Sequence, residues 1–213
     1  GTTSRGLGDV YKRQFQNGAM PELRVFNADG SEANNCVNGL RCVAFLYDLK
    51  NTYIQIKSKR FLVNKTSNGA TVKGELPKVD KIRDYFVIKF GNNHIAKSCV
   101  NIDGFKLQEE YEKIKTSKPY NEIKDFNMSV FKICEDIIKI RTYENGTGET
   151  LSCGSATISV AYALSKELNS NELKISSRGG DTIVRILNDG VISDASAEII
   201  REGFLNGWTK KIS

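Results

Sequence analysis

The sequence has little histidine and no long apolar run, and each shortage excludes a class of protein. Its 213 residues include one histidine, His94, so a zinc site built from several imidazoles is not expected. No apolar run reaches the roughly 18 to 20 residues that a membrane-spanning helix needs, and no opening segment has the pattern of a signal peptide. We therefore expect a soluble, cytoplasmic protein with no metal and no membrane partner.

Cysteine is present, but its spacing does not suggest a disulfide framework. The five cysteines are an odd number at wide, irregular intervals, which is typical of reduced thiols in a cytosol. Cys36 and Cys42 lie six residues apart on a predicted helix, so they point to different faces and cannot form a Cys-x-x-Cys metal or redox pair. The thiols are therefore available for acid–base chemistry.

Positive charge is in modest excess and is not clustered. Lys and Arg number 31 against 25 Asp and Glu, a net charge of +6, and the basic residues of 50–60 and 113–118 are interrupted by polar or apolar ones. Binding of a phosphate backbone requires clustered positive charge, so no nucleic-acid partner is expected. Gly6-x-Gly8 precedes no βαβ pattern, so a dinucleotide site is not supported either.

Apolar periodicity predicts a chain of strands with two helices. Residues 1–14 lack periodicity and are treated as a leader that need not belong to the domain. Helices are expected after each of two cysteines, over 40–50 and 156–168. Strands are expected at 23–26, 53–56, 61–63 and 85–90, within 130–143, and at 173–177 and 182–187, the last two joined by a tight turn.

The chain contains a weak internal repeat. A shift of 153 − 36 = 117 residues places Cys36 on Cys153, Val43 on Val160 and Ala44 on Ala161. In both copies a loop rich in small and polar residues precedes the cysteine and an amphipathic helix follows it. The sequence therefore predicts two halves with a loop, a thiol and a helix in each.

A cysteine at the start of a helix lies beside unpaired backbone N–H groups and the positive end of the helix dipole, which lowers the pKa of a thiol. A single cysteine in this position would be better explained as a small buried residue. Two in a repeated setting favour a functional role. One thiolate can remove a proton from a carbon while the other sulfur, as a thiol, returns a proton to the opposite face, which inverts the centre.

Two segments carry a family resemblance: residues 27–42 (NADGSEANNCVNGLRC) and 141–154 (RTYENGTGETLSCG) resemble the two signature segments of diaminopimelate epimerases. Between them, residues 91–94 (GNNH) and 126–130 (FNMSV) resemble two further segments of that family. The resemblance covers roughly residues 21–203.

The resemblance implies an α+β fold with two pseudo-symmetric halves, each a curved, mostly antiparallel sheet around a central helix, and an active site in the cleft between them. We place the first half at residues 15–85, with the tail 200–213 returning to it, and the second at residues 86–199. A homodimer is the assembly that the resemblance makes plausible.

The resemblance also implies a cofactor-independent isomerase that inverts the α-carbon of an amino acid, most simply one that converts LL- to meso-diaminopimelate in lysine and cell-wall biosynthesis. The implied bases are Cys36 and Cys153, with His94 and Glu144 beside the thiols. The substrate-binding residues implied are those holding its distal end, Asn27, Asn92 and Asn127, and the helix-start residues whose N–H groups hold the reacting carboxylate, Val37, Asn38, Gly154 and Ser155.

The sequence departs from the family at several places, the mildest being residues 155–157, where Ser-Ala-Thr replaces Thr-Gly-Ala. Val37 replaces a glycine after the first cysteine, and Asn145 replaces an arginine that would pair with a distal carboxylate. The family's opening strand and loop have no counterpart of the right length before Asn27, so a truncated or altered amino terminus is expected. Two alternatives therefore stay open, namely an amino-acid racemase with a different side-chain specificity and an inactive homologue with only a binding role.

Overall fold

The computed structural model describes residues 10–14, 20–26, 30 and 32–199. Asn27, the tail 200–213 and most of the predicted leader lie outside the described residues. The helices are α1 (Val37–Leu46), α2 (Leu107–Thr116) and α3 (Gly154–Ser165), with a 3-10 turn η1 (Tyr120–Glu122). The strands are β1 (Val10–Gln14), β2 (Glu22–Phe26), β3 (Thr52–Ile56), β4 (Lys59–Lys65), β5 (Gly69–Gly74), β6 (Lys78–Ile82), β7 (Tyr85–Phe90), β8 (Asn92–Ser98), β9 (Phe126–Cys134), β10 (Ile137–Glu144), β11 (Gly148–Thr150), β12 (Glu172–Ser177), β13 (Gly180–Leu187) and β14 (Gly190–Ser196).

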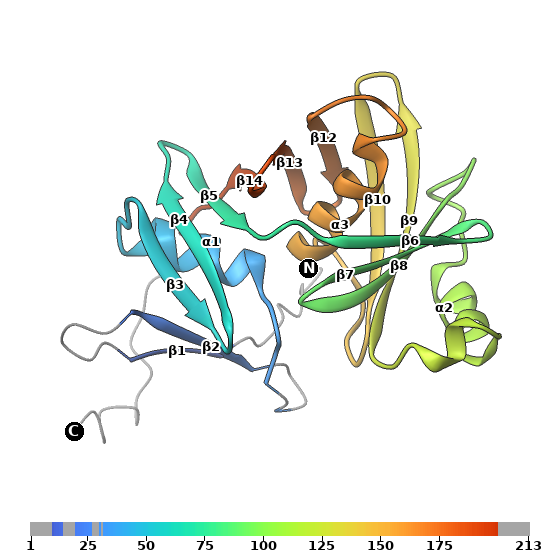
Figure 1. The fold of residues 1–213 in the computed structure, drawn as a ribbon, viewed down its shortest axis with the longest axis horizontal. Coiled ribbons are helices and arrows are strands. Elements are labelled where there is room, and N and C mark those ends of the chain that lie inside the picture. Colours follow the sequence, from blue (N-terminus) through green and yellow to red (C-terminus); the bar gives the residue numbers. More distant parts are fainter. Residues whose placement is uncertain (1–9, 15–19, 27–29, 31, 200–213) are drawn as a thin grey trace, which may run out of the picture.

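The strands join in one continuous, strongly curved sheet. Its order is β1-β2-β3-β4-β5-β14-β13-β12-β10-β9-β8-β7-β6, with β11 paired to β10 outside this path. Most neighbours are antiparallel, and the pairs β2–β3, β8–β9 and β10–β12 are parallel. Figure 1 shows the strands in two groups, one curved around α1 and the other around α3. Strand β14 joins the groups, because it pairs with β13 on one side and with β5 on the other.

Helix α1 forms because apolar residues at helical spacing can be buried against β4 and β5. Leu40 and Ala44 are fully buried there, in one apolar core with Ile54 and Val63. The helix ends at Leu46, four residues short of the predicted end, because Asp48 adopts a left-handed backbone conformation with φ of 51° that an α-helix cannot continue through.

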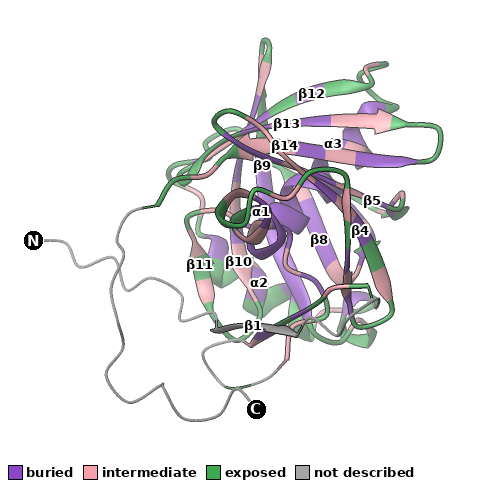
Figure 2. Cartoon of the chain, turned by 90° about the vertical axis from the view of Figure 1, so that its left-hand side faces the viewer, coloured by how far each residue is buried: buried purple, intermediate pink, exposed green. Residues whose placement is uncertain are grey.

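Helix α3 is the central helix of the second group. Nearly every one of its residues is buried, as expected for a helix that is apolar or small on all faces. Figure 2 shows it as a largely buried element enclosed by strands. Helix α2 covers the opposite face of β9 and β10, where Leu107, Tyr111 and Ile114 form a second core cluster.

The predicted fold class is confirmed: the protein is α+β, with a central helix in each of two sheet groups. Helices α1 and α3 begin 154 − 37 = 117 residues apart, which is the offset of the sequence repeat. The predicted strand 85–90 and the hairpin of β12 and β13 are also confirmed. The domain limits stay a prediction. The predicted boundary between residues 85 and 86 lies within β7, which pairs with β6 of the first half.

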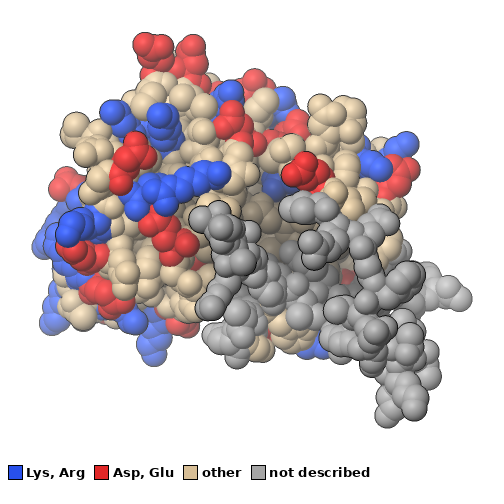
Figure 3. Space-filling model, turned by 180° about the vertical axis from the view of Figure 1, so that it is seen from behind, with Lys and Arg blue, Asp and Glu red and all other residues tan. Residues whose placement is uncertain are grey.

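Two surface properties bear on the expected partners. Within the part of the chain that the structure describes, no helix is both long and apolar enough to span a membrane. On the face in Figure 3, lysine and arginine side chains are interspersed with aspartate and glutamate. That face therefore does not present the single-sign patch that a phosphate backbone attracts.

Candidate active site

Cys36 is the N-cap of α1. Its backbone is extended (φ −147°, ψ 90°), and its Sγ accepts the backbone N–H of Gly39 at 3.3 Å. The sulfur thus takes the capping position that a serine or aspartate oxygen commonly fills. It lies at the positive end of the helix dipole, where negative charge is stabilised. This arrangement favours the thiolate form of Cys36.

Cys153 is the N-cap of α3 and is more buried, with 8% of its surface exposed. Its Sγ lies 3.4 Å from the hydroxyl oxygen of Ser155. Burial is the main cause that raises the pKa of this thiol well above its usual value, and the negative charge of Glu144 raises it further. Burial and the neighbouring carboxylate therefore favour the protonated thiol at Cys153.

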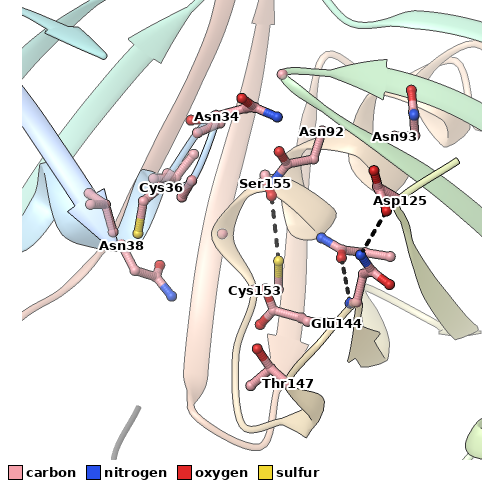
Figure 4. Close-up of a pocket in the computed structure, with 18 of the residues that line it drawn as sticks. Asn34, Cys36, Asn38, Asn92, Asn93, Asp125, Glu144, Thr147, Cys153 and Ser155 are labelled. Atoms are coloured by element: carbon pink, nitrogen blue, oxygen red, sulfur yellow. Dashed lines mark hydrogen bonds between the residues drawn. The ribbon is translucent and has the colours of Figure 1, made fainter. Parts of the chain in front are cut away.

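Glu144 reaches this thiol from the end of β10. Its carboxylate accepts a hydrogen bond from the hydroxyl of Thr150 at 2.6 Å, across the β10–β11 pair. Figure 4 shows Glu144 next to Cys153 on the wall of the cavity. The structure therefore brings these two predicted site residues together.

The starts of α1 and α3 are in direct contact. A Cβ atom added to Gly154 would lie 2.7 Å from Oδ1 of Asn38 and 2.9 Å from Cβ of Val37. Only a residue without a side chain fits at this distance. Asn38 also donates from Nδ2 to the carbonyl oxygen of Ser152 at 3.2 Å. The residue after one cysteine thus touches the residue after the other, although they lie far apart in the chain.

A buried arginine supports this contact. Arg41 is 5% exposed and donates to Oδ1 of Asn38 at 2.8 Å, to the hydroxyl of Ser193 at 2.7 Å and to the carbonyl of Ala70 at 3.3 Å. It therefore links α1, β5 and β14, and it orients the Asn38 amide toward the loop before Cys153. Asn35 makes a second link, because it donates from Nδ2 to the carbonyl of Phe90 at 3.1 Å.

The two helix starts open into one cavity of about 640 Å³, shown in Figure 4. Its size suits a small metabolite, and both cysteines line it. Nine predicted site residues lie on its wall: Cys36, Val37, Asn38, Asn92, Asn127, Glu144, Cys153, Gly154 and Ser155. Asn27 lies outside the described residues. Among the side chains that the structure describes, no three His, Cys, Asp or Glu gather as metal ligands would.

His94 is the predicted site residue that does not line the cavity. It lies on β8 two residues after Asn92, and alternate residues of a strand share a face, so it occupies the next, deeper position on that face. It is 1% exposed, and neither ring nitrogen has a hydrogen-bond partner among the described residues. Burial lowers the pKa of His94 to about 3, so the imidazole is neutral at ordinary pH.

The buried imidazole predicts a specific acid sensitivity of the fold. Between about pH 3 and the unfolded value of 6.5, the folded protein binds fewer protons at His94 than the unfolded chain does. The free energy of unfolding therefore falls as the pH drops through this window, by up to about 1.4 kcal/mol per pH unit. His94→Gln, which does not titrate, should lose less stability than the natural chain between pH 8 and pH 5, by about 2 kcal/mol in urea unfolding. An equal loss in both proteins would contradict the prediction.

The structure adds cavity residues that the sequence analysis did not single out. They are polar or charged and come from four segments, namely the loop before α1, strand β8, the residues before β9 and the turn between β10 and β11: Glu32, Asn34, Asn35, Asn93, Lys124, Asp125 and Thr147. The sequence held one signal for them, because Asn93 and Asp125 each lie within two residues of a predicted asparagine contact. Strand β8 pairs with β9 in parallel, so the amino-terminal ends of both strands lie side by side at the same end of the pair.

Curated proteins of similar sequence are diaminopimelate epimerases. The one from Nitrosomonas europaea is 31% identical over 193 residues, which cover 76% of this chain and 69% of that protein. Those from Buchnera aphidicola and Archaeoglobus fulgidus are each 28% identical, with 65% and 75% of their lengths covered. The chain thus spans roughly two thirds to three quarters of these relatives. No protein-family model matches it.

Solved structures of similar shape support the fold. A phenazine biosynthesis protein of the PhzF family from Bacillus anthracis has a TM-score of 0.68 at 13% identity, over 87% of this chain and 80% of that one. A hydroxyproline epimerase from Agrobacterium vitis has a TM-score of 0.58 at 10% identity, over 87% and 70%. At these identities the likeness concerns the fold alone.

Proposed function

Because the chain belongs to the diaminopimelate epimerase family, we propose that it inverts the α-carbon of an amino acid by acid–base catalysis with two cysteines. One observation carries the proposal: each of two touching helix starts has a cysteine as its N-cap, and both cysteines line one cavity. Such a site holds a base and an acid without any cofactor. The name of the relatives points to LL-diaminopimelate as substrate and meso-diaminopimelate as product.

The α-carboxylate of the substrate would bind at the converging helix starts. The N–H groups at the first turns of α1 and α3 have no partner within their helices, and the two dipoles add at the same place. Val37, Asn38, Gly154 and Ser155 supply these positions. When the α-proton leaves, negative charge spreads into the carboxylate, and the same donors stabilise it.

The two sulfurs would have different roles at rest. Cys36, which accepts an N–H from Gly39, acts as the base and takes the α-proton, and the electron pair of that C–H bond stays on carbon. Cys153, whose pKa is raised by burial and by Glu144, acts as the acid and gives its proton to the opposite face of the carbon. The charge then lies on the Cys153 sulfur, and the reverse reaction uses the sulfurs in exchanged roles.

Solvent deuterium tests the proposal. In D2O, each inversion should place one deuterium on the α-carbon of the product, because the incoming proton comes from a thiol that exchanges with solvent. We expect the protein to transfer deuterium into an amino-acid substrate and to convert one stereoisomer into the other, measured by mass spectrometry and chiral chromatography. The absence of exchange with diaminopimelate and with neutral and basic amino acids would favour the inactive binding protein.

A different amino acid is the second candidate substrate, and one observation favours it. Asn145 lies on the cavity wall at the position where the family has an arginine. An asparagine amide cannot offer the charge-assisted, two-pronged contact that a guanidinium makes to a carboxylate. The chemistry at the α-carbon would be the same in this case.

A further inference from the structure

The end of the cavity remote from Cys36 carries an exposed carboxylate, that of Asp125. Figure 4 shows Asp125 and Asn93 on the opposite side of the cavity from Cys36, with Cys153 and Ser155 between them. Asp125 directly precedes β9, and its Oδ1 accepts a hydrogen bond from Nδ2 of Asn145 at 3.3 Å. A substrate whose α-carbon lies between the two sulfurs would extend its side chain toward this end.

Asn145 is held in place by three neighbours. Its Oδ1 accepts from the hydroxyl of Tyr111 at 2.8 Å, while its backbone N–H donates to Oδ1 of Asn127 at 3.0 Å. With its amide oxygen turned to Tyr111, the amide nitrogen is left facing Asp125. Asn145 therefore positions the carboxylate of Asp125 instead of binding a carboxylate of the substrate.

Acidic residues outnumber basic ones among the described residues of the cavity wall. The acidic residues that line it are Glu32, Asp125 and Glu144, and Lys124 is the one basic residue among the described lining residues. Glu32 is held by Arg24 in a two-pronged ion pair at 2.9 and 3.0 Å, and Glu144 lies at Cys153. Asp125 is thus the acidic group at the far end of the cavity. Asn93 donates from Nδ2 to the carbonyl oxygen of Lys124 at 2.8 Å.

We propose that this end of the cavity binds the terminal ammonium of a substrate side chain, so that the preferred substrate is a diaminomonocarboxylic acid such as lysine. The inference rests on the function proposed above. An ammonium group can donate three hydrogen bonds, and the Asp125 carboxylate and neighbouring amide oxygens accept them. A second carboxylate, as in diaminopimelate, would lie beside Asp125 with no arginine among the described lining residues, and like charges at close range repel.

The test compares α-proton exchange of L-lysine and LL-diaminopimelate in D2O under the same conditions. We expect the natural protein to have the higher kcat/KM for lysine by a factor of about ten. Asp125→Asn, which removes the charge at constant size, should lower kcat/KM for lysine about tenfold and raise it for diaminopimelate, whose second carboxylate is then no longer repelled. Asn145→Arg should shift preference toward diaminopimelate. Asp136→Asn, an exposed residue in the β9–β10 turn, is the matched control and should change neither substrate.

A binding measurement separates failure of this inference from failure of the proposed function. Each amino acid is tested for protection of Cys36 and Cys153 against alkylation by iodoacetamide, read by peptide mass spectrometry. Protection by lysine that Asp125→Asn removes, without exchange of either amino acid, would reject the catalytic proposal and support the inference. Preferential exchange or protection by diaminopimelate, unaffected by Asp125→Asn, would overturn the inference and leave the proposed function in place. Absence of both exchange and protection would overturn both.

Discussion

Replacing Cys153 by alanine is expected to abolish inversion while leaving exchange of one stereoisomer with solvent. Cys36 keeps its place at the start of α1 and can still remove a proton from its own face of the carbon and return one there. Without the second sulfur, no proton is delivered to the other face. General acid–base groups contribute typically 10²- to 10⁴-fold to a rate, so inversion should fall by about 10²- to 10⁴-fold. Cys36→Ala should show the converse, with exchange confined to the opposite stereoisomer.

Deuterium content and configuration of the recovered amino acid, measured together, distinguish these outcomes. Cys153→Ser keeps the size of the buried side chain and checks that the loss does not come from a cavity at a residue that is 8% exposed. Cys134→Ala is the matched control, since Cys134 lies at the end of β9 and does not line the cavity. Full inversion by either single alanine variant would show that one sulfur is not needed and would refute the two-base mechanism.

Gly154→Ala should cost at least about 100-fold in turnover, because the added methyl group would push the helix starts apart. Its Cβ would lie 2.7 Å from Oδ1 of Asn38 and 2.9 Å from Cβ of Val37, closer than packed atoms come. A displacement near 1 Å of positioned groups can cost about 10² in rate. Overpacking should also lower the free energy of unfolding by about 1 to 3 kcal/mol.

A compensating change makes this prediction specific. Val37→Gly removes two of the three closest contacts, so the double variant Val37→Gly/Gly154→Ala should recover part of the lost turnover. Ala163→Gly is a stability control, because it costs about 1 kcal/mol in α3 away from the contact. Turnover that is unchanged in Gly154→Ala, or lost equally in Ala163→Gly, would mean that the close contact of the helix starts does not position the sulfurs.

The parts of the site that depend on local sequence patterns could be predicted from the sequence. A cysteine shortly before an apolar helical repeat is a local pattern, and both Cys36 and Cys153 are N-caps in the structure, where the helices begin three and two residues earlier than predicted. The two helices have the same 117-residue offset as the two cysteines, because each helix begins directly after its cysteine. Hairpins such as β12–β13 were also predictable, because a tight turn sets their register.

The parts that depend on pairing between distant strands were not predictable. Asp125 reaches the cavity because β9 runs parallel to β8, and no local pattern in either strand specifies that neighbour. His94 is a different case: the resemblance implied a place beside the thiols, and in the structure it lies on the face of β8 that carries Asn92, one position deeper and buried. The close approach at Gly154 is likewise visible only when α1 and α3 are both in place.

The placement of β14 has a consequence for synthesis of the protein on the ribosome. Residues 69–74 emerge early, yet the strand that completes hydrogen bonding along their outer edge ends at Ser196. Until that strand emerges, β5 presents a row of unpaired backbone groups, which is a template for misassociation between nascent chains. The buried Arg41 guanidinium also lacks one of its hydrogen-bond acceptors, the hydroxyl of Ser193, until then. The sheet group around α1 is therefore completed late in synthesis. Chaperone binding to stalled chains should be strongest before residue 190 is translated.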